Sequence, residues 1–461
     1  MRRFGDRPVA MRVKRHGRWE DLSYRHLADQ VRDLSLGLLE LGLRPGDRVA
    51  ILSENRPEWA AADYACLAAR CTDVPVYPTL PARQIEHILR DSGSAAIFVS
   101  SRAQLDKVHA VRSRLPELRH VIAFDDEAGG AGVLALREMQ TQGRGAVARH
   151  PLWREHALNV VPGDLATLIY TSGTTGDPKG VMLTHGNIAS NVAASLSLFT
   201  FGPNDECLSF LPLSHIFERM LGHYALFHAG VTINYATSID TVAAEMLERR
   251  PTVVASVPRL YEKILARVLE TVRQSSTPRR RIFAWSRAVG ETYVDHLVAR
   301  RPMPRRLALR YALADRLVFR KLRARTGGRV RFFVSGGAPL APDVARFFYA
   351  AGMPIYEGYG LTETSPVIAV NRPGRVRPGT VGAPIPGVAV RIADDGEIVV
   401  RGPNVMQGYY GKPGPTAEAI DAEGWFHTGD IGMIDDEGCL RITDRKKDLI
   451  VTAGGKNIAP Q

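Results

Sequence analysis

The chain reads LATLIYTSGTTGDPKG from Leu165 to Gly180. The first six residues are mostly apolar and are typical of a buried strand. The next ten contain three glycines, four hydroxyl side chains and one lysine. Glycines let backbone N–H groups turn toward an anion, while hydroxyls and a lysine add donors and charge. The segment therefore predicts a polyphosphate-binding loop, formed by Thr171, Ser172, Gly173, Thr174, Thr175, Gly176 and Lys179.

Two other interpretations of this segment are weaker. A Walker loop has Ser or Thr directly after its lysine, whereas Gly180 follows Lys179 in this chain. A flexible turn between two elements would also contain glycine and threonine. A flexible turn does not require a preceding buried strand, four hydroxyls and a lysine together, so this interpretation is weaker.

Strand and helix patterns alternate on both sides of this loop. Ser23 is a capping residue, and leucines follow it at helical spacings, so a helix is predicted to begin there. Apolar runs predict buried strands at residues 48–52, 95–99, 252–257 and 331–335. This alternation is typical of an α/β fold in which helices cover mostly parallel sheets.

The pattern changes after Asn371. Short β-rich pieces, such as residues 388–392 and 397–400, are separated by Gly and Asp at intervals of about eight to twelve residues. We therefore expect a large N-terminal α/β domain of helix-covered, mostly parallel sheets and a small β-barrel-like subdomain. The expected boundaries are 1–371 for an α/β core of two subdomains, 372–443 for the β-rich subdomain, and 444–461 for a hinge and the start of another domain.

Positive charge is concentrated in one region. The whole chain has a formal net charge of +12, yet Arg273 to Arg331 alone contains 17 Arg and Lys against three acids. Such a stretch is typical of solvated helix faces. It would also suit peripheral contact of residues 273–331 with an anionic membrane, or a polyphosphate ligand. No recognised nucleic-acid-binding motif accompanies the charge, so no nucleic-acid partner is predicted.

The cysteine spacings and the hydropathy of the chain predict its cellular location. Its four cysteines have spacings that suit neither a zinc site nor a disulfide framework, so reduced, packed thiols are expected. The N-terminus lacks the apolar stretch of a signal peptide, and no uncharged apolar run reaches about 18 residues. We expect a cytoplasmic protein, with peripheral attachment to the inner face of a membrane as an open alternative.

Five further segments carry candidate site residues: LPLSHIFER at 211–219, VSGGAPL at 334–340, YEGYGLTET at 356–364, GWFHTGD at 424–430 and ITDRKKDLI at 442–450. Taken alone, His215 would more often have a structural role, and Arg445 would belong to a solvated basic turn. Glu363 offers a carboxylate of the kind that Mg²⁺ prefers beside substrate phosphates. Asp430 offers only acceptors, which suits a vicinal diol.

Together with the phosphate loop, these segments resemble those of the AMP-forming adenylate ligases, which include acyl-CoA synthetases, luciferases and peptide-synthetase adenylation domains. The resemblance covers essentially the whole chain. It implies that Lys179, His215, Thr362 and Glu363 are catalytic, with His215 beside the substrate carboxylate and Thr362 at the α-phosphate. It also implies that Glu363 and Thr171 hold Mg²⁺, and that Lys447 is a hinge pivot. The nucleotide-binding residues implied are those of the phosphate loop with Gly337, Ala338, Pro339, Glu357, Gly358, Tyr359, Gly360, Thr362, Asp430 and Arg445.

The resemblance also implies a reaction. ATP would activate a fatty acid to acyl-AMP with release of pyrophosphate, and coenzyme A would then take the acyl group. The segments at 211–219 and 451–457 look most like the long-chain branch. Aryl- or medium-chain-CoA ligases, fatty-acyl-AMP ligases and a nucleotide- and acyl-binding module with little turnover remain alternatives. A homodimer is a further expectation.

The sequence departs from the family pattern at its end. It stops at Gln461, a few residues beyond the hinge segment. The family has a further small domain of roughly a hundred residues, which carries a lysine that assists adenylation. We therefore expect the 461-residue chain to keep a nucleotide and acyl site and to turn over slowly.

Overall fold

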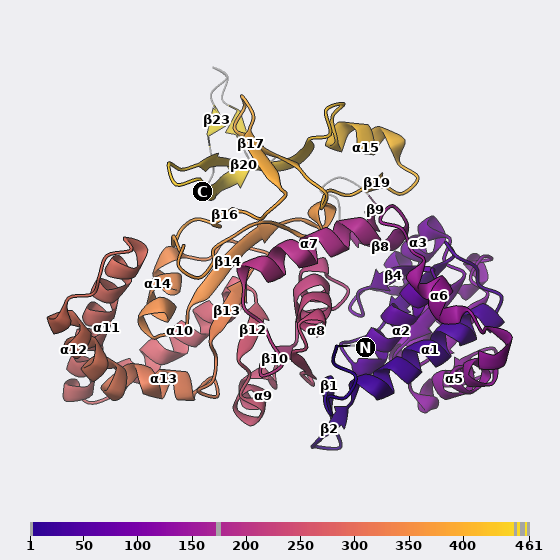
Figure 1. The fold of residues 1–461 in the computed structure, drawn as a ribbon, viewed down its shortest axis with the longest axis horizontal. Coiled ribbons are helices and arrows are strands. Elements are labelled where there is room, and N and C mark those ends of the chain that lie inside the picture. The colour runs from indigo at the N-terminus through magenta and orange to yellow at the C-terminus, as the bar shows by residue number, and fades with distance from the viewer. Residues whose placement is uncertain (1–2, 172–176, 447–449, 452–456, 459–461) are drawn as a thin grey trace.

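Two large, mostly parallel sheets form the body of the protein (Figure 1). The computed structural model describes residues 3–171, 177–446, 450–451 and 457–458. The first sheet has nine strands, in the order β16 (Ala383–Pro384), β15 (Val367–Val370), β14 (Ile355–Gly360), β13 (Phe332–Ser335), β12 (Val253–Ser256), β10 (Glu206–Ser209), β11 (Thr232–Tyr235), β1 (Met11–Arg15) and β2 (Arg18–Leu22).

The second sheet has eight strands and carries the predicted phosphate loop. Its order is β19 (Gly408–Tyr409), β9 (Lys179–Thr184), β8 (Leu165–Thr171), β4 (Thr72–Val76), β3 (Arg48–Leu52), β5 (Ala96–Val99), β6 (His120–Ala123) and β7 (Leu134–Ala135). The strands expected at 48–52, 95–99, 252–257 and 331–335 are confirmed as β3, β5, β12 and β13. Each is a nearly continuous apolar run because both faces of a parallel sheet are covered.

Helices cover both sheets, as the alternating pattern predicts. Around the second sheet lie α1 (Tyr24–Glu40), α2 (Pro57–Ala68), α3 (Ala82–Ser92), α4 (Arg102–His109), α5 (Leu136–Gly145) and α6 (Trp153–Leu158). The helices beside the first sheet are α8 (Leu226–His228), α9 (Val242–Arg249), α10 (Pro258–Arg273) and α14 (Pro342–Ala350). The capping prediction is confirmed, because Ser23 Oγ accepts a hydrogen bond from the His26 amide at 3.1 Å.

A shared apolar core joins the two sheets. It contains Ile169 and Val181 of the second sheet and Val334 and Tyr356 of the first. Helix α7 (His185–Leu198) and the π-helix η4 (Glu218–Ala225) pack into the same core. Figure 1 shows α7 crossing from one sheet to the other. The two sheets are therefore held as neighbours, and loops from both can line one site.

A third sheet caps this junction. It is antiparallel, in the order β17 (Ala389–Ile392), β18 (Glu397–Arg401), β20 (Phe426–Ile434) and β21 (Leu440–Arg445), and it lies above the large sheets in Figure 1. Helix α15 (Pro413–Ala419) precedes β20, and the two-stranded sheet of β22 (Ile450–Val451) and β23 (Asn457–Ile458) follows β21. The expected β-rich part is therefore present. The domain boundaries stay a prediction, since β16 and β19 fall within 372–443 but pair into the large sheets.

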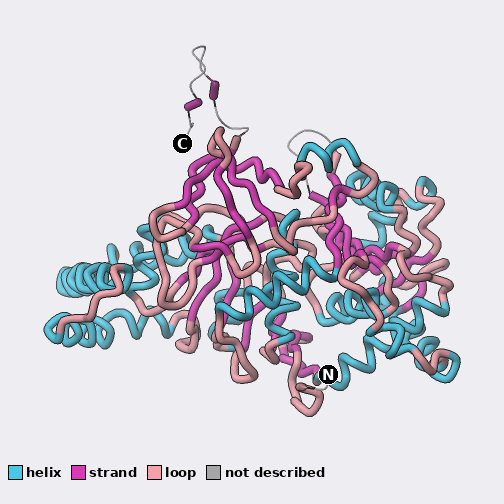
Figure 2. Tube along the Cα trace, turned by 45° about the horizontal axis from the view of Figure 1, so that its top comes forward, coloured by secondary structure: helices cyan, strands magenta, loops and turns pink. Residues whose placement is uncertain are grey.

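The basic stretch forms helices at one end of the molecule. These are α11 (Thr277–Val298), α12 (Arg305–Ala314), the π-helical segment η5 (Asp315–Phe319) and α13 (Arg320–Ala324). Figures 1 and 2 both place them at the end far from the eight-stranded sheet. Over the described ranges, no helix has the length and apolarity needed to cross a membrane. All four cysteines are buried and free, as expected.

Candidate active site

A cavity of about 490 Å³ opens where the three sheets meet. Its wall combines the ends of β8 and β9, the strand β14 and the turn after it, the hairpin of β20 and β21, and residues of α7 and η4. Among the residues predicted from sequence, the described wall contains Thr171, Lys179, His215, Gly337, Gly358, Tyr359, Gly360, Thr362, Glu363, Asp430 and Arg445. Thr171 and Arg445, which are 274 residues apart in the sequence, thus line one site.

The phosphate side of the cavity is built on a strand pair. Thr171 ends β8 and lies opposite Lys179, which begins β9. Ser172, Gly173, Thr174, Thr175 and Gly176 connect the two strands and lie outside the described residues. The Lys179 ammonium is 5.0 Å from the ring centroid of Tyr409 in β19. This contact directs the lysine along the cavity wall rather than into solvent.

Glu363 faces the cavity from the short turn Thr362–Thr364, which follows β14. Its Oε1 accepts a hydrogen bond from the Tyr409 hydroxyl at 3.0 Å. Burial raises the pKa of the Glu363 carboxyl, while Tyr409 and the nearby Lys179 partly offset this effect. A desolvated carboxylate with little compensating positive charge is a favourable place for a cation.

A second carboxylate lies on the opposite hairpin. Asp430 in β20 pairs with Arg445 in β21, and the Arg445 Nε is 3.5 Å from the Asp430 carboxylate. The Tyr359 hydroxyl donates to the other Asp430 oxygen at 2.6 Å. Burial raises the pKa of Asp430 as well. The aromatic ring and the acceptor that the resemblance assigns to adenine and ribose are therefore in direct contact.

The glycines of β14 allow close backbone packing beside the site. A Cβ on Gly360 would lie only 1.8 Å from the carbonyl oxygen of Pro366, so a side chain cannot fit there. Gly337, in the turn after β13, has a φ of +81° and is in the left-handed region that favours glycine. Both positions expose the backbone to the cavity.

Three of the predicted nucleotide-binding residues do not line the described cavity: Ala338, Pro339 and Glu357. Glu357 is buried in β14, and its Oε1 accepts a hydrogen bond from the Leu340 amide at 3.0 Å. Burial raises the pKa of Glu357 to about 7. Its observed contact is with the end of the 336–340 turn, so it fixes the turn that presents Gly337.

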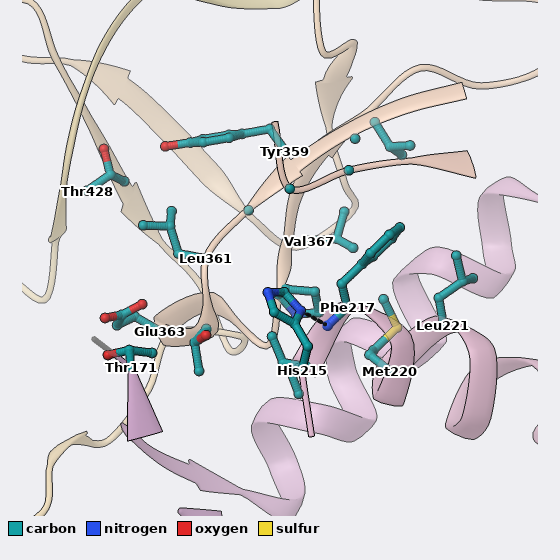
Figure 3. A pocket seen from close by; sticks show the side chains of 18 of the residues that line it. Thr171, His215, Phe217, Met220, Leu221, Tyr359, Leu361, Glu363, Val367 and Thr428 are labelled. Atoms are coloured by element: carbon teal, nitrogen blue, oxygen red, sulfur yellow. Dashed lines mark hydrogen bonds between the residues drawn. The ribbon is translucent and has the colours of Figure 1, made fainter. Parts of the chain in front are cut away.

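His215 lies between the polar and apolar parts of the cavity (Figure 3). Its Nδ1 accepts a hydrogen bond from the Phe217 amide at 3.1 Å. Although the ring opens to the cavity, the surrounding protein desolvates it and lowers the pKa of the imidazole. A neutral ring with Nδ1 as acceptor carries its proton on Nε2. His215 can therefore donate one hydrogen bond to a ligand.

The other end of the cavity is apolar. Figure 3 shows Phe217, Met220 and Leu221 on the side of His215 away from Glu363 and Thr171. The apolar wall consists of Phe199, Ile216, Phe217, Met220, Leu221, Val334, Val367 and Val370. The sequence alone did not locate this compartment, because its residues come from four separate segments of the chain. Tyr409 was missed as well, since a two-residue strand gives no recognisable pattern.

A buried ion cluster holds the apolar wall in place. Arg219 of η4 is completely buried and pairs with Asp63 of α2 and, at 2.5 Å, with Asp73 of β4. It also donates to the Thr167 hydroxyl in β8 at 2.8 Å. Burial raises the pKa of Asp73 to about 7. The cluster ties the helix that carries Met220 and Leu221 to the strand that leads into the phosphate loop.

Comparisons with known proteins agree with this architecture. The sequence model of the family described as AMP-binding enzyme matches residues 1–410. The chain therefore belongs to the AMP-binding enzyme family. It is 41% identical to the long-chain-fatty-acid–CoA ligase FadD15 of Mycobacterium tuberculosis over 450 residues, which cover 96% of this chain and 72% of that protein.

Solved structures share the fold. ATP-bound MatB from Rhodopseudomonas palustris is 26% identical and superposes with a TM-score of 0.76, covering 99% of this chain and 79% of that one. The N-terminal domain of FACL13 from Mycobacterium tuberculosis, 23% identical, superposes with a TM-score of 0.69 over 95% of this chain and 96% of that one. The predicted α/β class with a small antiparallel subdomain is confirmed.

Proposed function

We propose that this protein uses ATP to activate a long-chain fatty acid as acyl-AMP and then transfers the acyl group to coenzyme A. The observation that carries the proposal is that one cavity joins two unlike ends. Thr171, Lys179 and Glu363 line its polar end, whereas Met220 and Leu221 belong to its apolar end. The name of the mycobacterial relative supports a long-chain acid as the substrate.

In the first step, a carboxylate oxygen of the fatty acid attacks the α-phosphorus of ATP. A new P–O bond forms, the bond to the β-phosphate breaks, and pyrophosphate leaves. Such a transfer depends on positioning and charge stabilisation more than on covalent chemistry by the protein. Lys179 and the 172–176 loop would hold the β- and γ-phosphates. Thr362 would contact the α-phosphate, and the His215 Nε2 proton would orient the attacking carboxylate.

The opposite hairpin would hold the nucleoside. Asp430 accepts from Tyr359 and retains lone pairs for the two ribose hydroxyls. The ring of Tyr359 lines the cavity beside Gly337 and Gly358, where small residues let a flat base approach the backbone. Arg445 would add a donor to the ribose.

The residues at the polar end suit Mg²⁺. Glu363 has one carboxylate oxygen beyond the one that Tyr409 occupies, and the Thr171 side chain lines the same cavity. The described residues hold no cluster of three or more His, Cys, Asp or Glu that could form a metal site by themselves. Mg²⁺ commonly combines one or two protein ligands with substrate phosphates. When bound, the ion would neutralise charge on the phosphates.

The second step forms the thioester. The coenzyme A thiol loses its proton to solvent, its sulfur forms a C–S bond to the acyl carbonyl carbon, the bond from that carbon to the adenylate oxygen breaks, and AMP leaves. The use of coenzyme A as the acyl acceptor distinguishes the proposal from a ligase that passes the acyl group to a carrier protein. A direct comparison of coenzyme A with a phosphopantetheinylated carrier protein as acceptor would decide between them.

Pyrophosphate exchange into ATP tests the first step. We expect exchange that depends on palmitate and is weaker with octanoate or benzoate. Lys179→Ala and Glu363→Ala should each lower the exchange rate by about 10²–10³-fold. Matched controls are Lys412→Ala and Glu418→Ala, which remove exposed side chains outside the cavity wall. Exchange near the wild-type rate in either cavity variant, or a preference for benzoate, would contradict the proposal.

A further inference from the structure

The basic end of the molecule exposes a row of leucines. Leu309, Leu313 and Leu317 follow one another at intervals of four along the continuous helical run 305–324, so they share one side of it. Their exposed fractions are 74%, 50% and 37%. Single exposed leucines are normal on soluble proteins, but an aligned row of three is the kind of apolar surface that marks an interaction site.

Arginines flank this row on the same side. Arg306 and Arg310 lie one turn from Leu309 and Leu313, Arg320 lies one turn beyond Leu317, and all three are exposed. No carboxylate of the described residues pairs with them. The same holds for the neighbouring basic residues Arg279, Arg280, Arg281, Arg301, Arg305, Arg316, Lys321 and Arg325. We call Leu309, Leu313, Leu317, Arg306, Arg310 and Arg320 the α12 face.

The opposite side of the same helix is firmly packed. Leu307, Ala314 and Phe319 are buried in the core of the nine-stranded sheet. The Tyr311 hydroxyl donates to the Ala350 carbonyl at 3.0 Å, and its ring centroid is 4.3 Å from that of Tyr293. The helix therefore cannot turn its leucines inward without giving up this packing, and the α12 face is presented permanently to the outside.

We propose that the α12 face binds peripherally to the surface of an anionic lipid bilayer. Leucine side chains would enter the boundary between headgroups and acyl chains, while guanidinium groups pair with lipid phosphates. The local excess of positive charge complements an anionic leaflet. A nucleic-acid backbone would satisfy the arginines but leave the leucine row against phosphates, so it fits the face less well.

The proposal goes beyond the ligase activity and does not involve the cavity. Its test is flotation of the purified chain with vesicles of phosphatidylcholine alone or mixed with phosphatidylglycerol. We expect flotation with the anionic vesicles, weakened by salt because exposed charges are screened. The double variant Arg306→Gln/Arg310→Gln should reduce vesicle partitioning by about 25-fold, since each arginine near an anionic surface contributes about fivefold.

Leucine variants test insertion separately from charge. Leu309→Gln/Leu313→Gln keeps every arginine and should still reduce partitioning at least tenfold if the row enters the bilayer. Matched controls are Leu158→Gln/Leu247→Gln and Arg83→Gln/Arg154→Gln, which change exposed residues on other helices. Without vesicles, the two α12-face variants and the two control variants should all exchange pyrophosphate at the same rate. If the wild type and all four variants lacked exchange, that result would contradict the ligase function and leave the membrane proposal unaffected.

Three outcomes would overturn the membrane proposal. The first is a wild-type chain that does not float with anionic vesicles. The second is α12-face variants that partition like their controls. The third is binding to duplex DNA at physiological salt that the arginine variant abolishes while vesicle binding is absent.

Discussion

The Tyr409 hydroxyl donates a hydrogen bond to Glu363 Oε1 at 3.0 Å, and the same tyrosine ring lies 5.0 Å from the ammonium of Lys179. Tyr409 belongs to β19, which pairs with β9, the strand that Lys179 begins. One side chain thus connects the two charged groups that would face the triphosphate. It sets the distance between them before any ligand binds.

Removing the Tyr409 hydroxyl should weaken the proposed Mg²⁺ site. In Tyr409→Phe the ring still contacts Lys179, but Glu363 loses a donor that lowers the pKa of its carboxyl. A hydrogen bond to a charged group contributes about 1.5–3 kcal/mol, so the Mg²⁺ concentration for half-maximal ATP binding should rise by about 10–100-fold. Titration of ATP binding with MgCl₂ measures this. Tyr410→Phe is the control, and equal Mg²⁺ dependence in both variants would show that Tyr409 has no such role.

Asp430 should control recognition of the ribose. The wild-type chain should bind ATP more tightly than 2′,3′-dideoxy-ATP, because the carboxylate accepts from both hydroxyls. Asp430→Ala should weaken ATP binding by about 10–100-fold and bind both nucleotides equally. Calorimetry with the two nucleotides tests this, with Asp436→Ala as a control on the loop of the same hairpin. If Asp430→Ala kept the preference for ATP, the ribose assignment would be wrong.

Ionisation of the Glu357 carboxyl should make the free energy of unfolding fall as pH rises. Burial raises the pKa of its carboxyl from 4.5 to about 7, so the folded state keeps a proton that the unfolded chain releases. Its stabilising contribution is complete below pH 4.5 and is lost as pH rises through about 7. The amide of Glu357→Gln can still accept the hydrogen bond from the Leu340 amide. The free energy of unfolding of this variant, relative to that of the wild type, should therefore increase by roughly 2–3 kcal/mol between about pH 4 and about pH 8.

Urea unfolding at several pH values measures this difference. Glu418→Gln, which changes an exposed glutamate, should parallel the wild type throughout. A Glu357→Gln profile that also parallels the wild type would mean that the folded Glu357 carboxyl ionises normally.

Arg219 should be required for stability. Arg219→Met leaves Asp63 and Asp73 buried without their cation, and loss of one member of a buried ion pair costs roughly 3–5 kcal/mol. Adding Asp63→Asn and Asp73→Asn should recover much of this loss. Arg102→Met, which breaks an exposed helical pair with Asp106, should cost less than about 1 kcal/mol. An Arg219→Met chain as stable as Arg102→Met would contradict the role of the cluster.

Much of the fold could be predicted from the sequence because its signals are local. The strand that becomes β8 is one apolar run, and Ser23 caps α1 through a contact three residues away. The antiparallel subdomain was predictable because Gly and Asp separate its strands. The domain boundaries stay a prediction, because β16 pairs with β15 and β19 pairs with the distant strand β9, so both short strands join the large sheets.

The site was predictable only in part. Asp430 and Glu363 belong to recognisable segments, and the structure brings both to one cavity. Glu357 has the same motif context, but its alternation along β14 directs it to the Leu340 amide instead. The apolar wall depends on a π-helix, whose apolar spacing cannot be distinguished from that of an α-helix in sequence. Arg219 gives no sign of burial either, because its partners Asp63 and Asp73 lie about 150 residues earlier.

The crystal structure of this chain with Mg²⁺ and ATP would test the central claim most directly. We predict density for the triphosphate between Lys179 and Glu363, with the cation on the Glu363 carboxylate and the ribose hydroxyls at Asp430. A nucleotide bound elsewhere, or a triphosphate that contacts neither Lys179 nor Glu363, would contradict it.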